Sequence, residues 1–91
     1  MLRGRTRRDA NEAAILDSFK RAGWAVLKIN EPGAPDAVVF RWDYDAWRTY
    51  LIEIKVPKGK LRPKQVKFQE QWKGPPVKVV RTIEDVIEMV R

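Results

Sequence analysis

The chain has 91 residues, enough for one domain and too few for a second domain of usual size. Lysine and arginine total 19 against 12 aspartate and glutamate, so the formal charge is +7, which favours a polyanionic partner. Cysteine and histidine are both absent, which excludes disulfide frameworks, thiolate or imidazole zinc sites, and mechanisms with a histidine base. An enzyme built from this chain would use carboxylates, lysine and a hard cation.

No apolar run approaches the length of a membrane span, and no segment joins a strongly basic face to a broad apolar one. The sequence therefore predicts a cytoplasmic protein that does not contact a membrane. Residues 1–8 contain four arginines and one glycine, and we expect a flexible basic segment there. This segment is either a solubilising tail or an arm that binds phosphates. Residues 9–91 are expected to form a single domain.

Apolar periodicity and breaker residues predict three helices and four strands in that domain. The helices are expected at 9–22, at 63–73 and from 83 onward, and the strands at 24–30, 36–40, 48–56 and 77–81. A loop at 43–47 would join the second and third strands into an antiparallel hairpin. The crossover through the second helix lets the fourth strand run parallel to a strand of the meander. The predicted fold is α/β, of order αβββαβα, with a central mixed sheet flanked by helices.

The run Leu-Ile-Glu-Ile-Lys-Val at 51–56 places an acid and an amine two positions apart in an apparently buried strand. Side chains alternate along a strand, so Glu53 and Lys55 point to the same face. Burying both is costly unless they have a function. The alternative is an ordinary cross-strand charge pattern on an exposed edge strand.

Asp36 directly follows a Pro-restricted turn and begins the hairpin arm whose partner ends near Glu53. Because the arms are antiparallel, the start of one lies near the end of the other, which brings the two carboxylates together. Such a pair suits Mg²⁺, with Mn²⁺ as a substitute. Lys55 would then stabilise negative charge that develops on a phosphate and position the attacking water. Taken alone, Asp36 is also compatible with an ordinary turn residue.

Two predicted helices carry polar residues on their apolar faces. Glu12 lies on the apolar side of the first helix, where a glutamate is unusual, although a glutamate in a first turn is also stabilised by the helix dipole. On the second helix Gln65 and Gln69 share a face with Phe68 and Trp72. We expect these polar groups to reach towards the same place as the carboxylate pair.

Four basic residues directly follow the predicted metal site: Lys58, Lys60, Arg62 and Lys64. As a cluster they are placed to contact phosphates beside the scissile bond, whereas singly each is compatible with a solvated loop. Tyr44 and Trp47 lie in the predicted hairpin loop, where they would stack on a base, form a dimer contact or cover a sheet edge. A small core with four tryptophans favours self-association as a homodimer.

An ordered set of residues resembles the VRR-NUC domain of the PD-(D/E)XK nuclease superfamily. The set consists of Glu12, Gly33-Ala34-Pro35-Asp36, Glu53-Ile54-Lys55, Lys58-Gly59-Lys60-Leu61 and Gln65, and the match runs from Glu12 to about Val86. The resemblance implies a restriction-endonuclease-like core and a Mg²⁺-dependent endonuclease that hydrolyses phosphodiester bonds in DNA. It also implies a free-standing phage or prophage type and, as in similar domains, a homodimer that acts on branched DNA such as Holliday junctions.

The resemblance also implies a role for each matching residue. Asp36 and Glu53 would be metal ligands, and Lys55 would be the catalytic lysine. Glu12 would be an active-site acid on the first helix. Gln65 would be an added motif residue on the second helix, and Gln69, one turn on, is an alternative for that role.

Two other functions remain open at this point. One is a basic nucleic-acid-binding module without catalysis, in which Glu53 and Lys55 form a structural ion pair. The other is a nuclease subunit that is active only in a larger assembly. Glu12 and Asp36 argue against a pure binding module, since acids repel the phosphates that it would hold.

Overall fold

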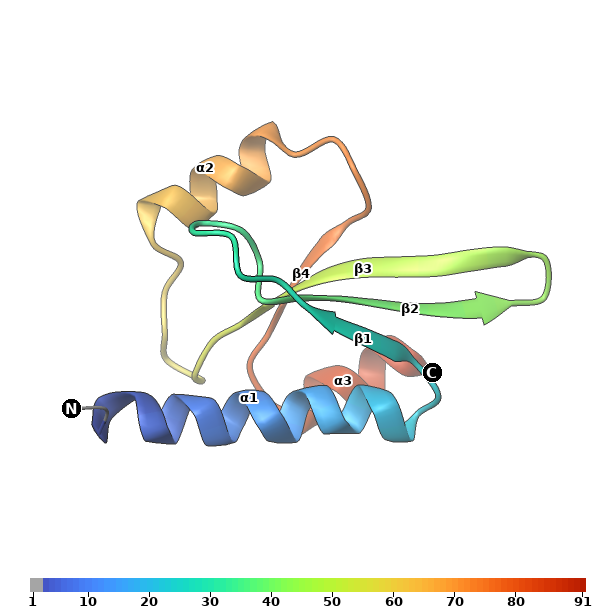
Figure 1. The fold of residues 1–91 in the computed structure, drawn as a ribbon, viewed down its shortest axis with the longest axis horizontal. Coiled ribbons are helices and arrows are strands. Elements are labelled where there is room, and N and C mark those ends of the chain that lie inside the picture. Colours follow the sequence, from blue (N-terminus) through green and yellow to red (C-terminus); the bar gives the residue numbers. More distant parts are fainter. Residues whose placement is uncertain (1–2) are drawn as a thin grey trace.

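The computed structural model describes residues 3–91, and it describes side chains from residue 11 onward. A four-stranded mixed sheet lies between α1 and α3 on one side and α2 on the other (Figure 1). The elements in chain order are α1 (Arg3–Arg21), β1 (Ala25–Lys28), β2 (Ala37–Asp43), β3 (Ala46–Ile54), α2 (Pro63–Gln71), β4 (Val77–Val80) and α3 (Ile83–Val90). The predicted α/β class and the order αβββαβα are confirmed. Within the described residues, no helix is both long enough and apolar enough to cross a membrane.

The strands lie side by side in the order β1-β2-β3-β4. The pairs β1–β2 and β2–β3 are antiparallel, as a meander requires, and β4 pairs with β3 in parallel. The parallel pairing follows from the crossover through α2, because a parallel neighbour cannot be reached by a tight turn. This topology makes β3 an inner strand with a hydrogen-bonded neighbour on each side.

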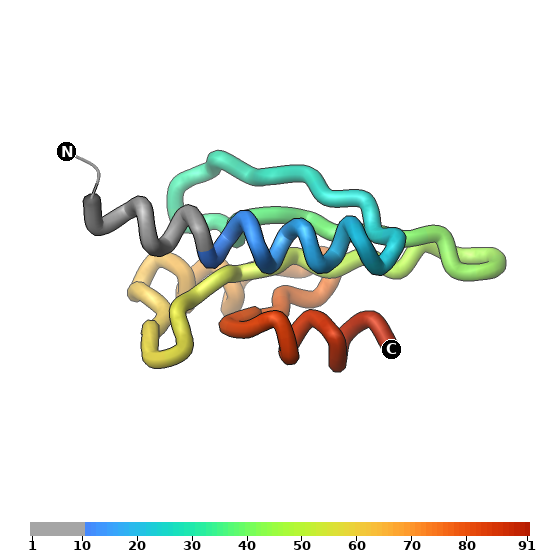
Figure 2. Tube along the Cα trace, turned by 90° about the horizontal axis from the view of Figure 1, so that it is seen from below, coloured from blue at the N-terminus to red at the C-terminus, as the bar shows by residue number. Residues whose placement is uncertain are grey.

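The core lies between the sheet and the two helices α1 and α3, which run side by side across one face (Figure 2). Ile15, Leu16 and Phe19 of α1 are buried, as their helical spacing predicts. From the sheet, Val39, Ile52 and Val80 are among the residues that face them. Residues on β3 therefore alternate as expected, with Ile52 and Ile54 in the core and Glu53 on the opposite face.

The ends of α1 and α3 follow local rules, with one difference from the prediction. α1 is followed by Gly23 at φ +92°, a conformation that a glycine adopts at no steric cost. It begins at Arg3, six residues before the expected start at residue 9. Residues 1 and 2, and the side chains of residues 3–10, lie outside the described part, so the role proposed for the basic segment stays a prediction. At α3, Thr82 accepts a hydrogen bond from the N–H of Asp85 and donates its own N–H to the Asp85 carboxylate, and the two bonds form a capping box.

The hairpin between β2 and β3 is tighter than predicted. The expected loop at 43–47 is wrong, because β2 runs to Asp43 and β3 begins at Ala46. Only Tyr44, at φ +63°, and Asp45 form the turn. The cause is an aromatic pair across the strands: Trp42 lies opposite Trp47, with ring centroids 5.2 Å apart in a T-shaped arrangement. Such pairs stabilise antiparallel strands and extend the ladder up to the turn.

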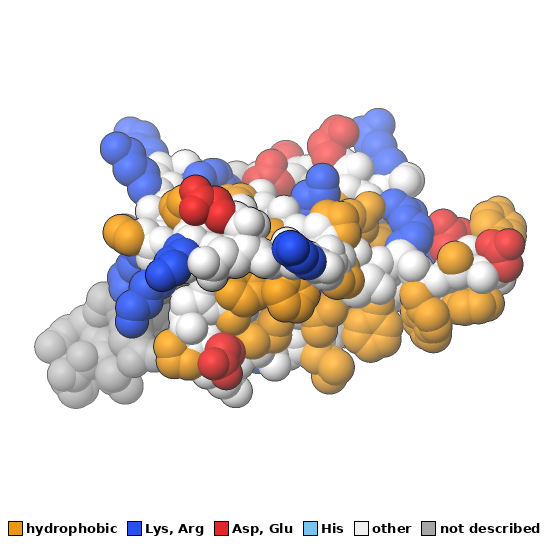
Figure 3. All heavy atoms as spheres, turned by 90° about the horizontal axis from the view of Figure 1, so that it is seen from above, with side chains coloured by type: hydrophobic (Ala, Val, Ile, Leu, Met, Phe, Trp, Pro, Cys, Tyr) orange, Lys and Arg blue, Asp and Glu red, His pale blue; other side chains and the backbone are white. Residues whose placement is uncertain are grey.

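The face of the sheet that points away from α1 and α3 is covered only in part. α2 lies over the end of that face where β3 finishes, and the β2–β3 hairpin extends beyond it (Figure 1). Leu27, Trp42 and Trp47 are large apolar residues that remain exposed there. Figure 3, which views this face, shows hydrophobic side chains in a band from the middle of the molecule to the hairpin end.

Candidate metal and nucleic-acid site

An acid and an amine are buried together at the end of β3, with Glu53 in the strand and Lys55 directly after it. Glu53 is 1% exposed and Lys55 is 8% exposed. The Lys55 Nζ atom lies 4.0 Å from Oε2 of Glu53. Because β3 is an inner strand, the alternative of an exposed charge pattern on an edge strand is wrong. Burial removes water from both charges, which destabilises the fold unless hydrogen-bond or ion-pair partners compensate.

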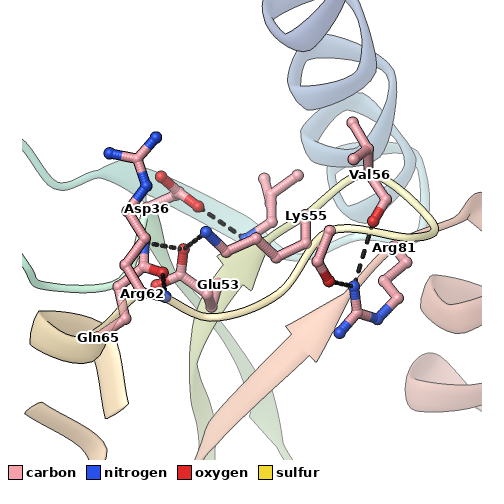
Figure 4. Close-up of polar contacts among 9 residues, drawn as sticks. Asp36, Glu53, Lys55, Val56, Arg62, Gln65 and Arg81 are labelled. Atoms are coloured by element: carbon pink, nitrogen blue, oxygen red, sulfur yellow. Dashed lines mark hydrogen bonds and ion pairs between the residues drawn. The ribbon is translucent and has the colours of Figure 1, made fainter. Parts of the chain in front are cut away.

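Asp36 is fixed against β3 by two hydrogen bonds. Its backbone N–H donates to the carbonyl of Ile52 at 2.8 Å. Its Oδ2 atom accepts the backbone N–H of Ile54 at 2.7 Å. The Asp36 carboxylate therefore binds the backbone of the residue that lies between Glu53 and Lys55. Figure 4 shows the three side chains meeting at the end of β3. The predicted juxtaposition of Asp36 with the Glu53–Lys55 pair is therefore present.

Gln65 joins α2 to this group. Its Nε2 donates to Oε2 of Glu53 at 3.1 Å, and its Oε1 accepts the backbone N–H of Arg62 at 2.8 Å (Figure 4). The second bond settles the orientation of the amide, because the oxygen must face the start of α2 and the NH₂ group must face Glu53. Gln69 makes no such contact: its Nε2 is buried and meets no hydrogen-bond partner in the described part of the chain. Of the two candidate glutamines, the structure brings Gln65 to the site.

Glu12 lies in a different set of contacts. Its carboxylate is 3.0 Å from Nζ of Lys28, and both residues line an open hollow of about 580 Å³ between α1 and β1. Because α1 begins at Arg3, Glu12 is not in the first turn, and its interpretation as a first-turn glutamate is wrong. Among the described side chains, no group of three or more acidic residues is placed to hold a metal ion. Asp36 and Glu53 are therefore the acids that the structure offers at this end of β3.

The basic cluster borders the site. Lys58, Lys60, Arg62 and Lys64 are all exposed and occupy the segment from the loop after β3 to the first turn of α2. An open pocket of about 600 Å³ is lined by Arg62, Lys64 and Gln65 together with the β1–β2 turn at Gly33. A Cβ atom at Gly33 would lie 3.5 Å from Cβ of Lys64, so the turn and the helix approach each other closely. Two positively charged side chains, Arg62 and Lys64, thus line the same pocket as Gln65.

Tyr44 is far from this group. It is 93% exposed at the hairpin turn, whereas the carboxylates lie at the other end of the same two strands. At about 3.3 Å per residue, the seven residues of β2 separate the two ends by roughly 23 Å. A contact of Tyr44 with nucleic acid would therefore be remote from the carboxylates.

Arg81 was missed by the sequence analysis. It directly follows β4, and its Nη1 donates to the carbonyls of Val56 and Gly59. The N–H of Gly59 donates to the carbonyl of Val56 at 2.9 Å, so Arg81 fastens a closed turn to the end of β4. That turn follows Lys55 and contains Lys58. A single arginine after a strand has no local signal in the sequence, because its partners lie 22 and 25 positions away.

We expect Arg81→Met to loosen this turn without unfolding the core. Loss of hydrogen bonds from a charged donor should speed amide exchange at Gly59 roughly tenfold or more. The measurement is hydrogen exchange by NMR, with Lys78→Met on β4 as the matched loss of an exposed cation. Equal exchange at Gly59 in the two variants would show that Arg81 does not hold the turn.

Comparison of the chain with protein-family models, with curated proteins and with solved structures found no match. The resemblance to the VRR-NUC domain therefore rests on the motif residues alone.

Proposed function

We propose that this chain is a Mg²⁺-dependent nuclease that hydrolyses phosphodiester bonds in DNA, with Mn²⁺ as an effective substitute. The observation that supports the proposal most directly is the burial of Glu53 and Lys55 beside Asp36 at the end of an inner strand. Well-packed apolar residues are often at least as stabilising as a buried ion pair, so packing alone does not explain these charges. The formal charge of +7 and the basic cluster favour a polyanionic substrate.

The residues fit a hard cation. Asp36 and Glu53 supply carboxylate oxygens, and Mg²⁺ commonly takes one or two carboxylates and completes its shell with water. Each carboxylate also accepts a hydrogen bond, from Ile54 N–H and from Gln65 Nε2, as metal-ligating carboxylates usually do. When bound, the ion would polarise a phosphoryl oxygen and lower the pKa of a bound water.

The chain's own groups have separate tasks in this proposal. Lys55 offers a positive charge beside the carboxylates, where it would stabilise the negative charge that develops on the phosphate and help to position water. Gln65 keeps Glu53 in one orientation through the bond to its Oε2 atom. The exposed basic cluster, which includes Arg62 and Lys64, would hold backbone phosphates on either side of the scissile bond.

Asp36→Asn tests the proposal. The asparagine oxygen can still accept the N–H of Ile54, so the fold should persist while the charge is lost. We expect wild-type protein to cut plasmid, flap or four-way-junction DNA with Mg²⁺ or Mn²⁺ but not with EDTA, and the variant to be inactive on all of them. Asp43→Asn is the matched control and should retain activity, because Asp43 lies at the hairpin end of β2, whose other end follows Asp36. Cutting in EDTA, or full activity of Asp36→Asn, would contradict the mechanism.

One observation favours a second candidate, a nucleic-acid-binding module without catalysis. Glu12 pairs with Lys28, and the described acids form no group of three around the site. On this alternative, no substrate is cut under any metal condition, and Asp36→Asn binds DNA at least as tightly as wild type because it removes a negative charge. If DNA is bound but cut only after a partner protein is added, the chain is a nuclease subunit of a larger assembly.

A further inference from the structure

An uncharged apolar surface occupies the hairpin half of the sheet face opposite the core. Its main members are Leu27, Val38, Phe40, Trp42 and Trp47, which we call the tryptophan face. The ring of Trp47 lies 5.2 Å from Trp42 and 5.6 Å from Phe40, so the aromatic residues form one connected group. Arg41 and Arg48, which are charged residues of this hairpin, lie opposite each other in the strand register. Because side chains alternate along a strand, both arginines point to the other face of the sheet.

The tryptophan face has no cover within the described residues 3–91. α2 lies over the other half of the same sheet face, where Gln65 meets Glu53, and α1 and α3 lie on the opposite face (Figure 1). Trp42 is 52% exposed, and Trp47 and Leu27 are each 59% exposed. Figure 3 shows the corresponding orange band open to the viewer up to the hairpin end. Side chains this large are usually shielded from water in a stable protein.

The apolar area of the tryptophan face is close to the apolar area that one partner contributes to a dimer interface of standard size. With about 250 Å² for a whole tryptophan, Trp42 and Trp47 together expose on the order of 280 Å². Leu27 and the half-buried Val38 and Phe40 bring the apolar area to roughly 400–500 Å². A standard interface removes about 800 Å² from each partner, and about 65% of that area is apolar in homodimers. The tryptophan face thus supplies most of the apolar area that a homodimer interface of standard size requires.

We infer that the tryptophan face is the contact between two copies of this chain. A two-fold axis sets the same residues opposite one another, so the contact needs no complementary charges. A polyanion would gain little from this face, because it contains no lysine or arginine. Two twisted sheets pack face to face about 10 Å apart, with their side chains interdigitated. Apolar rings that project from an uncharged face of a strand pair are suited to this packing.

The contact leaves each candidate metal site intact. Glu53 is six positions from Trp47 along β3, a distance of about 20 Å. The two copies would therefore join through their hairpin ends, and each would retain its own carboxylates and basic cluster. This inference does not depend on the proposed nuclease activity, and its test does not measure cleavage.

Sedimentation equilibrium between about 1 and 100 μM protein tests the inference, a range in which specific complexes of standard size commonly associate. Wild type should reach close to twice the 10.6 kDa mass of one chain. Trp42→Thr combined with Trp47→Thr keeps strand-forming residues and should raise the dimer dissociation constant about 100-fold or more. Ile87→Lys on α3, where Ile87 is 49% exposed, is the matched control and should leave the dissociation constant unchanged.

A second variant covers the case in which the double substitution unfolds the protein. Leu27→Lys changes one exposed side chain on the short outer strand β1 and places a charge at the contact in both copies. It should also give monomers, with circular dichroism like that of wild type. Wild type that stays monomeric at 100 μM would overturn the inference. A dimer that persists in both Leu27→Lys and the tryptophan variant would also overturn the inference. A monomeric wild type whose DNA affinity falls in these variants would overturn it as well, because the tryptophan face would then contact DNA and not a second copy.

Discussion

Replacing Lys55 with methionine is expected to lower the free energy of unfolding by about 3–5 kcal/mol. The change preserves most of the side-chain volume but removes the cation that lies 4.0 Å from a carboxylate that is 1% exposed. Glu53 would then remain buried without this ion-pair partner. The measurement is urea unfolding followed by tryptophan fluorescence.

The double variant Glu53→Gln with Lys55→Met separates structure from chemistry. It removes both charges, and a buried pair replaced by neutral residues is often as stable as the original. We therefore expect it to recover more than half of the stability that Lys55→Met loses. Cleavage should remain at least about 100-fold below wild type in the single and the double variant, because each lacks the charge that we propose stabilises the transition state.

The control is another ion pair of the same chain. Arg21 pairs with Asp17 on the exposed surface of α1, and Arg21→Met should cost no more than about 0.5 kcal/mol and leave cleavage unchanged. If the double variant recovers both stability and cleavage, the Glu53–Lys55 pair is structural, and the site must be sought elsewhere.

The placement of the central site residues was predictable because it depends on simple periodicity. A strand alternates its faces, so Glu53 and Lys55 had to share one, and an antiparallel hairpin had to return Asp36 to their neighbourhood. What the alternation does not reveal is how Asp36 is held. Its carboxylate accepts a backbone N–H of β3, a contact that depends on where β2 starts to within one residue.

The parts that the sequence did not predict correctly have different physical causes. Whether Glu12 stands in a first turn depends on where α1 begins, and the basic residues before it contain no stop signal. The length of the hairpin was set by the pairing of Trp42 with Trp47, which overrides the turn-forming residues at the predicted loop. Arg81 acts on carbonyls of another loop, and such contacts leave no pattern in the sequence.

Gln65→Glu is expected to lower cleavage about 10- to 100-fold while α2 stays formed. A glutamate at this position still accepts the N–H of Arg62 and sits favourably in the first turn of a helix. It has no hydrogen to donate to Oε2 of Glu53 and instead sets a second negative charge beside it. Gln65→Ala should lose cleavage too, and should in addition cost about 1 kcal/mol of stability because the start of α2 loses its acceptor.

Gln69→Met, one turn further along α2, provides the comparison that decides between the two glutamines. Its amide nitrogen is buried and meets no partner among the described residues, so its removal should leave stability unchanged or raise it by up to about 1 kcal/mol. Cleavage should stay within about threefold of wild type. Gln69 makes no direct contact with the carboxylates, so its replacement should remove less transition-state stabilisation than one hydrogen bond provides. Parallel cleavage rates and urea midpoints for the three variants and wild type are the measurement. If Gln69→Met is inactive and Gln65→Glu is active, α2 presents Gln69 to the substrate, and the bond between Gln65 and Glu53 has no role in the reaction.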